Sequence, residues 1–568
     1  MMLGDLSPCK RAEKSLGDGS GRRGNHPIVP NRGRPCAQGS AVRWHAARVK
    51  RNDTVPGSFP EALAGGAALG ALGPRRAPAW SLALALPILA ALAVCGPSAG
   101  AGPRAAVKMA VTTSSTEARA LYLRGFDLLE RRRYSEAYAF CREAVAKDPA
   151  FAVAHLCMYI TTGSKTEAVE ELKRAMALAD RVSEPERQWI RSDDAMERGD
   201  GATELAAITR VVTLLPDDEH AFNLLAAYHY RRRDYAAAID AYLKAAKIAP
   251  SYTLVYNQLG YSYEFLGRYA EAERAFQKYI ELLPDDPNPY DSYGELLMKM
   301  GSFTGSIQQY EKALAIDRRF ATAYIGIGND ELMLGRFADA RSTFARFLAA
   351  ARTDEDKRQA WLWTGLSHVH EGHTSEALAA VAKASAIAEP AGDLRGVAAD
   401  LHLAGEILLE AGRAGEAATQ FARQAAALDR MTAPDGVKAA GKRDARFDRG
   451  RVALANADLA AARAERDALL REATEAAAPA SLFRAHELAG RIALTEKDVA
   501  AAAAALEQSD PRDPRARYVL AVAVEAKGDP ARAQQIFAEV AGWTSIHPDL
   551  AFVRTKAAAA AARLARGR

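Results

Sequence analysis

The sequence predicts an all-α fold: a solenoid of stacked α-α helix hairpins that follows a disordered N-terminal extension. Three observations support this class. A chain of 568 residues is too long for one compact core, which favours several domains or a repeat array. No segment alternates between strand and helix patterns, so a Rossmann or hydrolase domain is not expected. Positions 34 residues apart are also related, because prolines stand at Pro216, Pro250 and Pro284, and Arg318 continues the register.

Each 34-residue unit is interpreted as two antiparallel helices joined by a tight turn. Small residues at the eighth and twentieth places let the helices approach closely, and aromatic residues at the seventeenth and twenty-fourth places fill the space beside that contact. Glycine at the turn, as in Gly267, Gly301 and Gly335, supplies a backbone conformation that other residues resist. One hairpin cannot bury its own apolar face, so neighbouring units must stack. The eighth place holds Ala226, Gly260, Gly294 and Gly328, and the seventeenth holds Tyr235, Tyr269, Phe303 and Phe337. The twentieth place holds Ala238, Ala272, Ser306 and Ala340, and the twenty-fourth holds Tyr242, Phe276, Tyr310 and Phe344.

These columns resemble the tetratricopeptide repeat family, most closely over residues 117–150 and 219–352. The resemblance extends through an array over 117–430 and continues as degenerate, alanine-rich repeats over 441–541. It implies a right-handed superhelix of helix pairs with a concave inner face. Together with the leader pattern described below, it leads us to expect a bacterial protein that is exported.

Three shorter segments carry their own structural signals. Ser183, followed three residues later by Glu186, predicts a capped helix start. Residues 430–446 predict a loop, and therefore a soft boundary between the two parts of the array. The basic segment 542–568 predicts a C-terminal helix that caps the stack and keeps its end soluble.

The N-terminal hundred residues differ from the rest. Residues 1–73 lack apolar periodicity, so we expect them to be disordered, or to be an upstream region assigned in error. Residues 74–103 combine a basic pair, a short apolar run and small residues, which is typical of a secretory signal peptide. The alternative is an uncleaved anchor that attaches the protein to the inner membrane through residues 77–95. Either reading predicts a periplasmic location, whereas translation from Met109 would leave the protein in the cytoplasm.

We expect no catalytic residues, no cofactor and no metal site. The histidines His368, His370 and His373 span a predicted helix end and cannot all share one helical face, so they are interpreted as exposed polar residues at a turn. No glycine-rich phosphate loop occurs in the sequence. The chain has 75 basic and 70 acidic residues, a net charge of +5, which argues against a dedicated nucleic-acid binder.

Two cysteines fall on consecutive predicted helices of the first two units. The apolar neighbours of Cys141 and Cys157 predict buried thiols that behave as small hydrophobic residues. If the protein is exported, the alternative is a disulfide that joins the two units.

In the family that the chain resembles, the first helix of each unit lines the groove. Asparagine amides there can pair with a peptide backbone, and tyrosines offer flat area with a polar tip. Tyr230 and Tyr261 stand at places that the core columns do not explain. The lysine of the chaperone-binding members is missing at the fifth place, where Ile325 is one of the occupants, so a chaperone C-terminal tail is not expected. The resemblance transfers groove positions to His220, Asn223, Tyr230, Arg231, Asn257, Tyr261, Glu264, Asn288, Asp291, Glu295 and Asn329.

The predicted function is that of a non-catalytic scaffold or adaptor which binds a protein or peptide in its concave groove. A regulatory sensor, whose solenoid responds to a small ligand, is the alternative. An enzyme is not expected, because no acid, base or metal set converges in the sequence.

Overall fold

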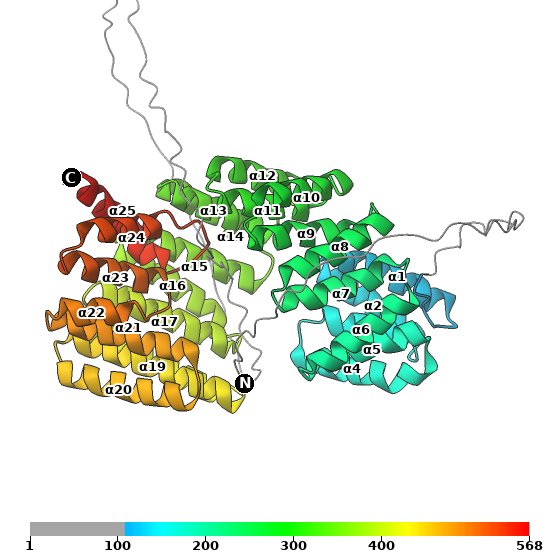
Figure 1. Cartoon of the computed structure of the whole chain (residues 1–568), viewed down its shortest axis with the longest axis horizontal. Helices are drawn as coiled ribbons and strands as arrows, with labels where there is room; N and C mark the ends of the chain where they lie inside the picture. Colours follow the sequence, from blue (N-terminus) through cyan, green and yellow to red (C-terminus); the bar gives the residue numbers. More distant parts are fainter. Residues whose placement is uncertain (1–107, 567–568) are drawn as a thin grey trace, which may run out of the picture. The chain divides into compact units, whose positions relative to one another are not determined.

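The computed structural model of the protein describes residues 108–566, and this range is helical apart from an irregular segment over 108–115 and the connections between helices (Figure 1). It contains 25 α-helices and one short 3-10 helix, Ala179–Arg181, and no strand within the described range. The first 24 helices form twelve successive hairpins, and the predicted all-α solenoid is confirmed. In the first six hairpins the helices are α1 (Thr116–Glu130), α2 (Tyr134–Lys147), α3 (Ala152–Thr161), α4 (Lys165–Leu178), α5 (Glu184–Glu197), α6 (Gly201–Leu214), α7 (Glu219–Arg231), α8 (Tyr235–Ile248), α9 (Thr253–Phe265), α10 (Tyr269–Leu282), α11 (Pro287–Lys299) and α12 (Phe303–Ile316).

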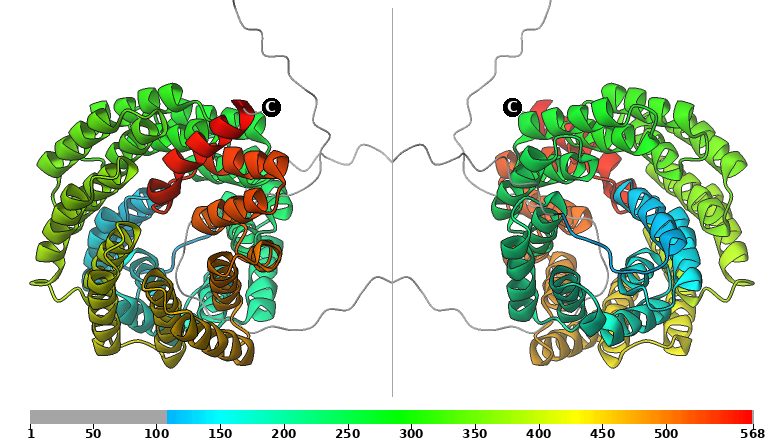
Figure 2. Two further views of the ribbon diagram at one scale, coloured as in Figure 1. Left: turned by 90° about the vertical axis from the view of Figure 1, so that its left-hand side faces the viewer. Right: turned by 90° about the vertical axis from the view of Figure 1, so that its right-hand side faces the viewer.

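The remaining hairpins continue the same pattern, and each helix packs against the next one along the chain (Figure 2). Their helices are α13 (Ala321–Met333), α14 (Phe337–Ala350), α15 (Asp354–His370), α16 (Thr374–Ala388), α17 (Leu394–Glu410), α18 (Ala414–Arg430), α19 (Asp435–Ala455), α20 (Leu459–Glu475), α21 (Pro479–Thr495), α22 (Val499–Leu506), α23 (Pro514–Ala526), α24 (Pro530–Ala541) and the final α25 (Leu550–Arg566).

The repeat columns have the packing roles that their spacing predicts. A Cβ atom placed on Gly260 would lie 2.4 Å from the Cε1 atom of Phe276, so only glycine allows the two helices of this hairpin to approach so closely. The turn glycine of the same hairpin, Gly267, has a φ of +69°, in the left-handed region. The twenty-fourth column is fully buried, whereas the seventeenth begins each second helix and is less covered, with Tyr269 36% exposed.

The capped helix start at Ser183 is confirmed. The Ser183 hydroxyl accepts a hydrogen bond from the backbone of Glu186, and the Glu186 side chain accepts one from the backbone of Ser183. The Glu186 carboxylate also accepts from the backbone N–H of Thr112 at 2.7 Å, so the cap holds the segment that leads into α1. Glu186 thus serves both the local cap at Ser183 and a tertiary contact with Thr112.

The loop predicted over 430–446 is wrong, because α19 begins at Asp435. Pro434 occupies the N-cap position, and only the few residues before it are non-helical. The glycines of this segment, Gly436 and Gly441, favoured a loop in the sequence, but α19 packs along both α18 and α20. Tertiary packing here outweighs weak local propensity.

Helix α25 does more than cap the last hairpin. It packs on α23 and α24, and also on α15, four hairpins earlier in the array. Arg554 of α25 is turned inward and donates to the carbonyl oxygens of Trp543, at 2.7 Å, and Met333, at 3.4 Å. The predicted basic helix is therefore present, but part of its charge serves contacts within the chain.

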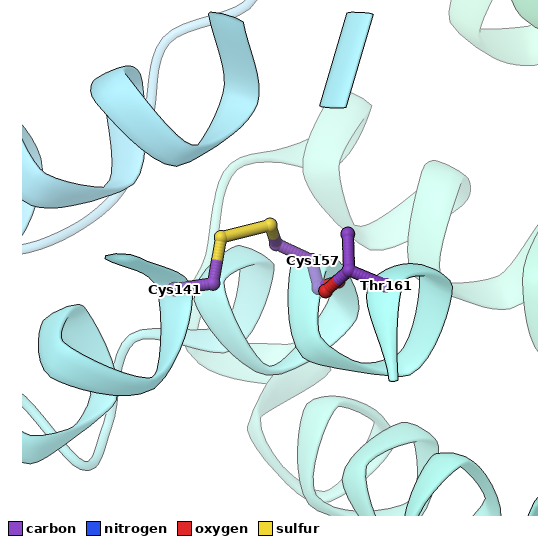
Figure 3. Close-up of a disulfide and its surroundings, with 3 residues drawn as sticks. All are labelled: Cys141, Cys157 and Thr161. Carbon is purple, nitrogen blue, oxygen red and sulfur yellow. A yellow bond between two sulfur atoms is a disulfide. The ribbon is translucent and has the colours of Figure 1, made fainter. Parts of the chain in front are cut away.

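Cys141 on α2 and Cys157 on α3 form a disulfide, so the prediction of two free thiols is wrong and the alternative is correct (Figure 3). Both sulfurs lie in the core, and the two Cα atoms are 6.0 Å apart, within the range that a disulfide requires. The bond links the first hairpin covalently to the second.

The predictions for residues 1–73 and 74–103 lie outside the described residues. Across 108–566, no helix has both the length and the apolar character needed to cross a membrane.

Candidate partner-binding groove

The eleven predicted groove residues lie on the first helices of four consecutive hairpins. The structure places them on α7 (His220, Asn223, Tyr230 and Arg231), α9 (Asn257, Tyr261 and Glu264), α11 (Asn288, Asp291 and Glu295) and α13 (Asn329). They differ in how far another molecule could contact them, because several already form hydrogen bonds or ion pairs within the chain.

A polar network connects α9 to α11 at the centre of this set. The Asn257 amide donates to the Ser292 hydroxyl at 3.0 Å, and the Tyr261 hydroxyl donates to Glu295 and lies 3.2 Å from the Ser292 hydroxyl. Asn257 is only 1% exposed, and its Oδ1 atom has no hydrogen-bond partner among the described residues. Ser292 was not predicted, because a lone serine on a helix carries no distinctive sequence signal. This network defines the central polar face of the candidate groove.

Acidic side chains surround the network. Burial and the neighbouring Glu295 raise the pKa of Asp291 well above its ordinary range, and burial raises the pKa of Glu295 to about 7. Burial also raises the pKa of Glu264, against the effect of Lys299, whose Nζ atom lies 3.3 Å from that carboxylate. The facing sides of α9 and α11 therefore carry more carboxyl groups than cations, and this excess suits a ligand that donates hydrogen bonds.

His220 on α7 faces the first hairpin. Its Nδ1 atom lies 3.1 Å from the Glu130 carboxylate, and its ring packs edge-on against Phe126 with centroids 5.4 Å apart. Burial would lower the pKa of His220, but Glu130, Asp218 and Glu219 together outweigh burial and raise it. The backbone N–H of Met109 donates to Asp218, the N-cap of α7, at 2.8 Å. The first hairpin and the segment before it therefore contact the start of α7.

Four further predicted residues have contacts within their own hairpin or with a neighbouring hairpin. Arg231 forms an ion pair with the buried Glu204 of α6. Asn288 donates to the Tyr279 hydroxyl at 3.0 Å, and Asn329 donates to the Ile325 carbonyl at 2.8 Å. The Tyr230 ring packs edge-on against Tyr235 and Phe265, and Asn223 is half-buried on the same helix.

Two clusters of side chains contain the donor types that metal ions prefer. His368 and His370 lie in the last turn of α15, and His373 is the N-cap residue of α16, so the three span a helix end as the sequence predicts. His370 is 8% exposed and stacks on Phe337, and His368 is half-buried, so the prediction that these histidines are exposed is wrong for both residues.

A second cluster, which sequence reasoning missed, brings ligand atoms of His402, Glu406 and Asp448 within 4.8 Å of one another. Arg451 donates to both Glu406 oxygens, at 2.6 and 2.7 Å, and Arg515 pairs with the same carboxylate. Burial would lower the pKa of His402, but Asp448 and Glu406 together raise it to about 8. Because two guanidinium groups already satisfy the acid, the cluster is an internal ion network and is poorly suited to a cation.

Comparison with known proteins supports the repeat assignment. Sequence models of the tetratricopeptide repeat match residues 191–253, 253–286, 325–393 and 493–545. Anaphase-promoting complex subunit 6 from Arabidopsis thaliana is 24% identical over 188 residues, which are 32% of this chain and 34% of that protein. The chain thus spans about a third of the length of this curated relative.

Three solved structures resemble parts of this chain. A tetratricopeptide repeat protein from Parabacteroides merdae covers 45% of this chain and 97% of its own, at 16% identity and a TM-score of 0.34. MamA covers 29% of this chain and 95% of its own, at 21% identity and a TM-score of 0.26. YrrB, described as a tetratricopeptide repeat protein with an unusual peptide-binding site, covers 32% and 92%, at 20% identity and a TM-score of 0.26.

Proposed function

Because the chain carries tetratricopeptide repeats in an all-helical solenoid, we propose that it is a non-catalytic scaffold or adaptor that binds a protein or peptide segment. The binding surface is the inner face of α9 and α11. The observation that carries the proposal is the Asn257–Ser292–Tyr261 network, which links α9 to α11. The half-buried Tyr261 and Glu295 at its edge offer a hydroxyl and a carboxyl group that a bound segment can hydrogen-bond.

The surface is held in place before a partner arrives. Asn257 and Tyr261 lie on one helix and Ser292 on the next, and hydrogen bonds between the helices hold their side chains in position. Little side-chain entropy is then lost on this side of the interface, which favours affinity without a large contact area. Tyr261 is half-buried: its hydroxyl takes part in the network, and the side chain still has surface for a partner to contact.

The test is recovery of the cellular partner by affinity purification and mass spectrometry. Changing Tyr230, Tyr261 and Asn257 together to Ala should reduce recovery while helicity, measured by circular dichroism, stays unchanged. Tyr256→Ala is the matched control, because Tyr256 lies on the same helix but its hydroxyl donates at 3.0 Å to the Pro250 carbonyl outside the network. Full recovery of the partner by the triple variant would remove this surface from consideration.

We also propose that the protein is bacterial and exported to the periplasm, with residues 74–103 acting as a signal peptide or as a membrane anchor. The disulfide between Cys141 and Cys157 supports this location, because disulfides persist in oxidising compartments. N-terminal sequencing of the native protein tests the cleaved form. A first residue at Gly102 supports export, whereas Met109 or Ala110 would indicate cytoplasmic translation from Met109.

A further inference from the structure

Residues 108–115 form an extended segment that lies against the array before α1 begins. They have neither helix nor strand structure, and their burial alternates: the odd-numbered residues are half-buried and the even-numbered residues are exposed. A period of two is typical of an extended chain with one side on a surface. The side chains of Met109 and Val111 pack against the hydrophobic cluster that contains Ile190. This segment therefore lies on the hairpins in the way that an extended peptide ligand would.

Four carboxylates contact this segment, and each stands just before, or in the first turn of, the first helix of the second, third or fourth hairpin. We call this set the acidic track, which consists of Asp148, Glu186, Asp218 and Glu219. The backbone N–H of Thr112 donates to Glu186 at 2.7 Å. The backbone N–H of Met109 donates to Asp218 at 2.8 Å. Because these two bonds come from the main chain, they require an extended backbone and no particular side chain.

The acidic track uses carboxylate oxygens that the helices do not need. The Oδ1 atom of Asp218 caps α7 by accepting from the backbone of its first turn, whereas the Oδ2 atom accepts from Met109. Asp148 divides its oxygens in the same way, between the backbone N–H of Ala150 and the Thr113 hydroxyl. The local caps and turns are therefore complete without the segment, and each second oxygen can accept from any extended chain placed there.

Side chains of the segment add selectivity to the backbone bonds. Lys108 forms an ion pair with Glu219. The Thr112 hydroxyl donates to Glu186, beside the bond from its own backbone. A lysine, apolar residues at the first and third places after it, and hydroxyl residues at the fourth and fifth places thus satisfy every contact that the segment makes with the acidic track and the hydrophobic cluster.

We propose that the acidic track binds an extended segment of a partner polypeptide with this lysine, apolar and hydroxyl pattern, and that residues 108–113 of this chain occupy the site until the partner displaces them. The proposal goes beyond the proposed function, because the acidic track is separate from the central polar face on α9 and α11. The segment is held by side chains of three hairpins and has no regular structure of its own, so the same contacts can form with a second chain.

The test uses the full chain and a labelled peptide with the sequence of residues 108–115, followed by fluorescence anisotropy. In the wild type the peptide must displace a segment of the same chain whose effective concentration is about 1 mM, so a peptide with a Kd of about 0.1 mM binds about 10-fold more weakly. Met109→Asp combined with Val111→Asp places charge on the half-buried side and should release the segment, which restores the tighter binding. Ala110→Asp combined with Ser114→Asp makes the same charge change on the exposed side and should leave the affinity at its wild-type value. Equal affinity of the wild type and the release variant, or no saturable binding by the release variant, would overturn the proposal.

Asp218→Asn in the release variant tests the acidic track itself. Asparagine is as good an N-cap as aspartate, so α7 stays capped, but an amide nitrogen replaces the oxygen that accepts from the extended chain. The peptide should therefore bind about 10-fold more weakly. Asp200→Asn is the matched control, because Asp200 is the N-cap of α6 and has no contact with the segment, so affinity should not change. Equal affinities of the two asparagine variants would reject this site.

Hydrogen exchange in the wild-type chain, read at single residues by mass spectrometry, keeps the inference testable if the release variant fails to fold. The backbone N–H groups of Met109 and Thr112 should exchange at least about 10-fold more slowly than that of Ala110, which has no hydrogen-bond partner among residues 108–566. Excess unlabelled peptide should remove this protection. Equal exchange rates, or protection that excess peptide leaves unchanged, would overturn the exchange of segments. If the cellular partner is lost from the triple groove variant but the peptide does not bind, only this inference fails and the proposed function stands.

Discussion

Close packing within the hairpins can be tested at Gly260. A Cβ atom at this position would lie 2.4, 2.5 and 2.7 Å from three carbons of the fully buried Phe276 ring. Carbon atoms prefer separations of about 3.5–4.0 Å, so the ring or the helix must move by about 1 Å. Overpacking of this kind costs about 1–3 kcal/mol, while replacing glycine by alanine inside a helix gains about 1 kcal/mol. Gly260→Ala should therefore lower the free energy of unfolding by about 0–2 kcal/mol, the difference of the two effects.

Gly441→Ala separates the two effects. Gly441 lies inside α19, and a Cβ atom there would be 3.4 Å from the Leu428 Cδ1 atom, close to ordinary contact. This substitution should raise stability by about 1 kcal/mol, so the two variants should differ by the overpacking cost of about 1–3 kcal/mol.

Urea unfolding followed by circular dichroism measures both variants, and hydrogen exchange shows which hairpins open, because stability in a repeat array is largely local. Phe276→Leu should recover part of the loss in the Gly260→Ala background. Equal stability changes at Gly260 and Gly441 would refute the proposed packing constraint.

Three further predictions concern crosslinking, pH and a buried ion pair. Replacing Cys141 and Cys157 by Ser removes a crosslink with a sequence separation of 16 and should lower the unfolding free energy by about 3 kcal/mol; an unchanged urea midpoint without reductant would contradict this. Burial raises the pKa of Asp330 from 3.8 to about 8, so the folded state favours the protonated carboxyl group. The stability that the protein has below pH ~4 is therefore lost as the pH rises through about 8 and Asp330 ionises. Asp330→Asn should therefore gain stability relative to the wild type across this window, by several kcal/mol at about 1.36 kcal/mol per pKa unit, and parallel pH profiles would exclude the shift. Arg358 donates to the fully buried Asp400 at 2.6 Å, so Arg358→Met should cost about 3–5 kcal/mol in thermal unfolding; an unchanged midpoint would show that the pair contributes nothing.

The repeat architecture could be predicted because its causes are local and periodic. A glycine at the eighth place and an aromatic residue at the twenty-fourth, such as Gly260 and Phe276, recur at fixed spacing because the same two helices meet in every hairpin. The cap at Ser183 depends on residues only three positions apart. The columns therefore identified the hairpins in the region of best repeats.

The assignment of groove residues stays a prediction. The structure does bring the side chains of Asn257, Tyr261 and Glu295 into one hydrogen-bond network across α9 and α11, since these positions follow from the repeat register. Their partner Ser292 could not be predicted, because its role depends on how two neighbouring hairpins are rotated against each other.

A periodic sequence pattern does not predict contacts between distant parts of the chain. His220 contacts Glu130, and α25 contacts α15, because stacking of many hairpins brings residues far apart in sequence close together. The disulfide likewise depends on the 6.0 Å between the Cα atoms of Cys141 and Cys157. Short-range spacing in the amino-acid sequence was enough to specify each hairpin, whereas the pairing of buried charges, the crosslink and the side chains that approach the groove depend on the accumulated geometry of the stack.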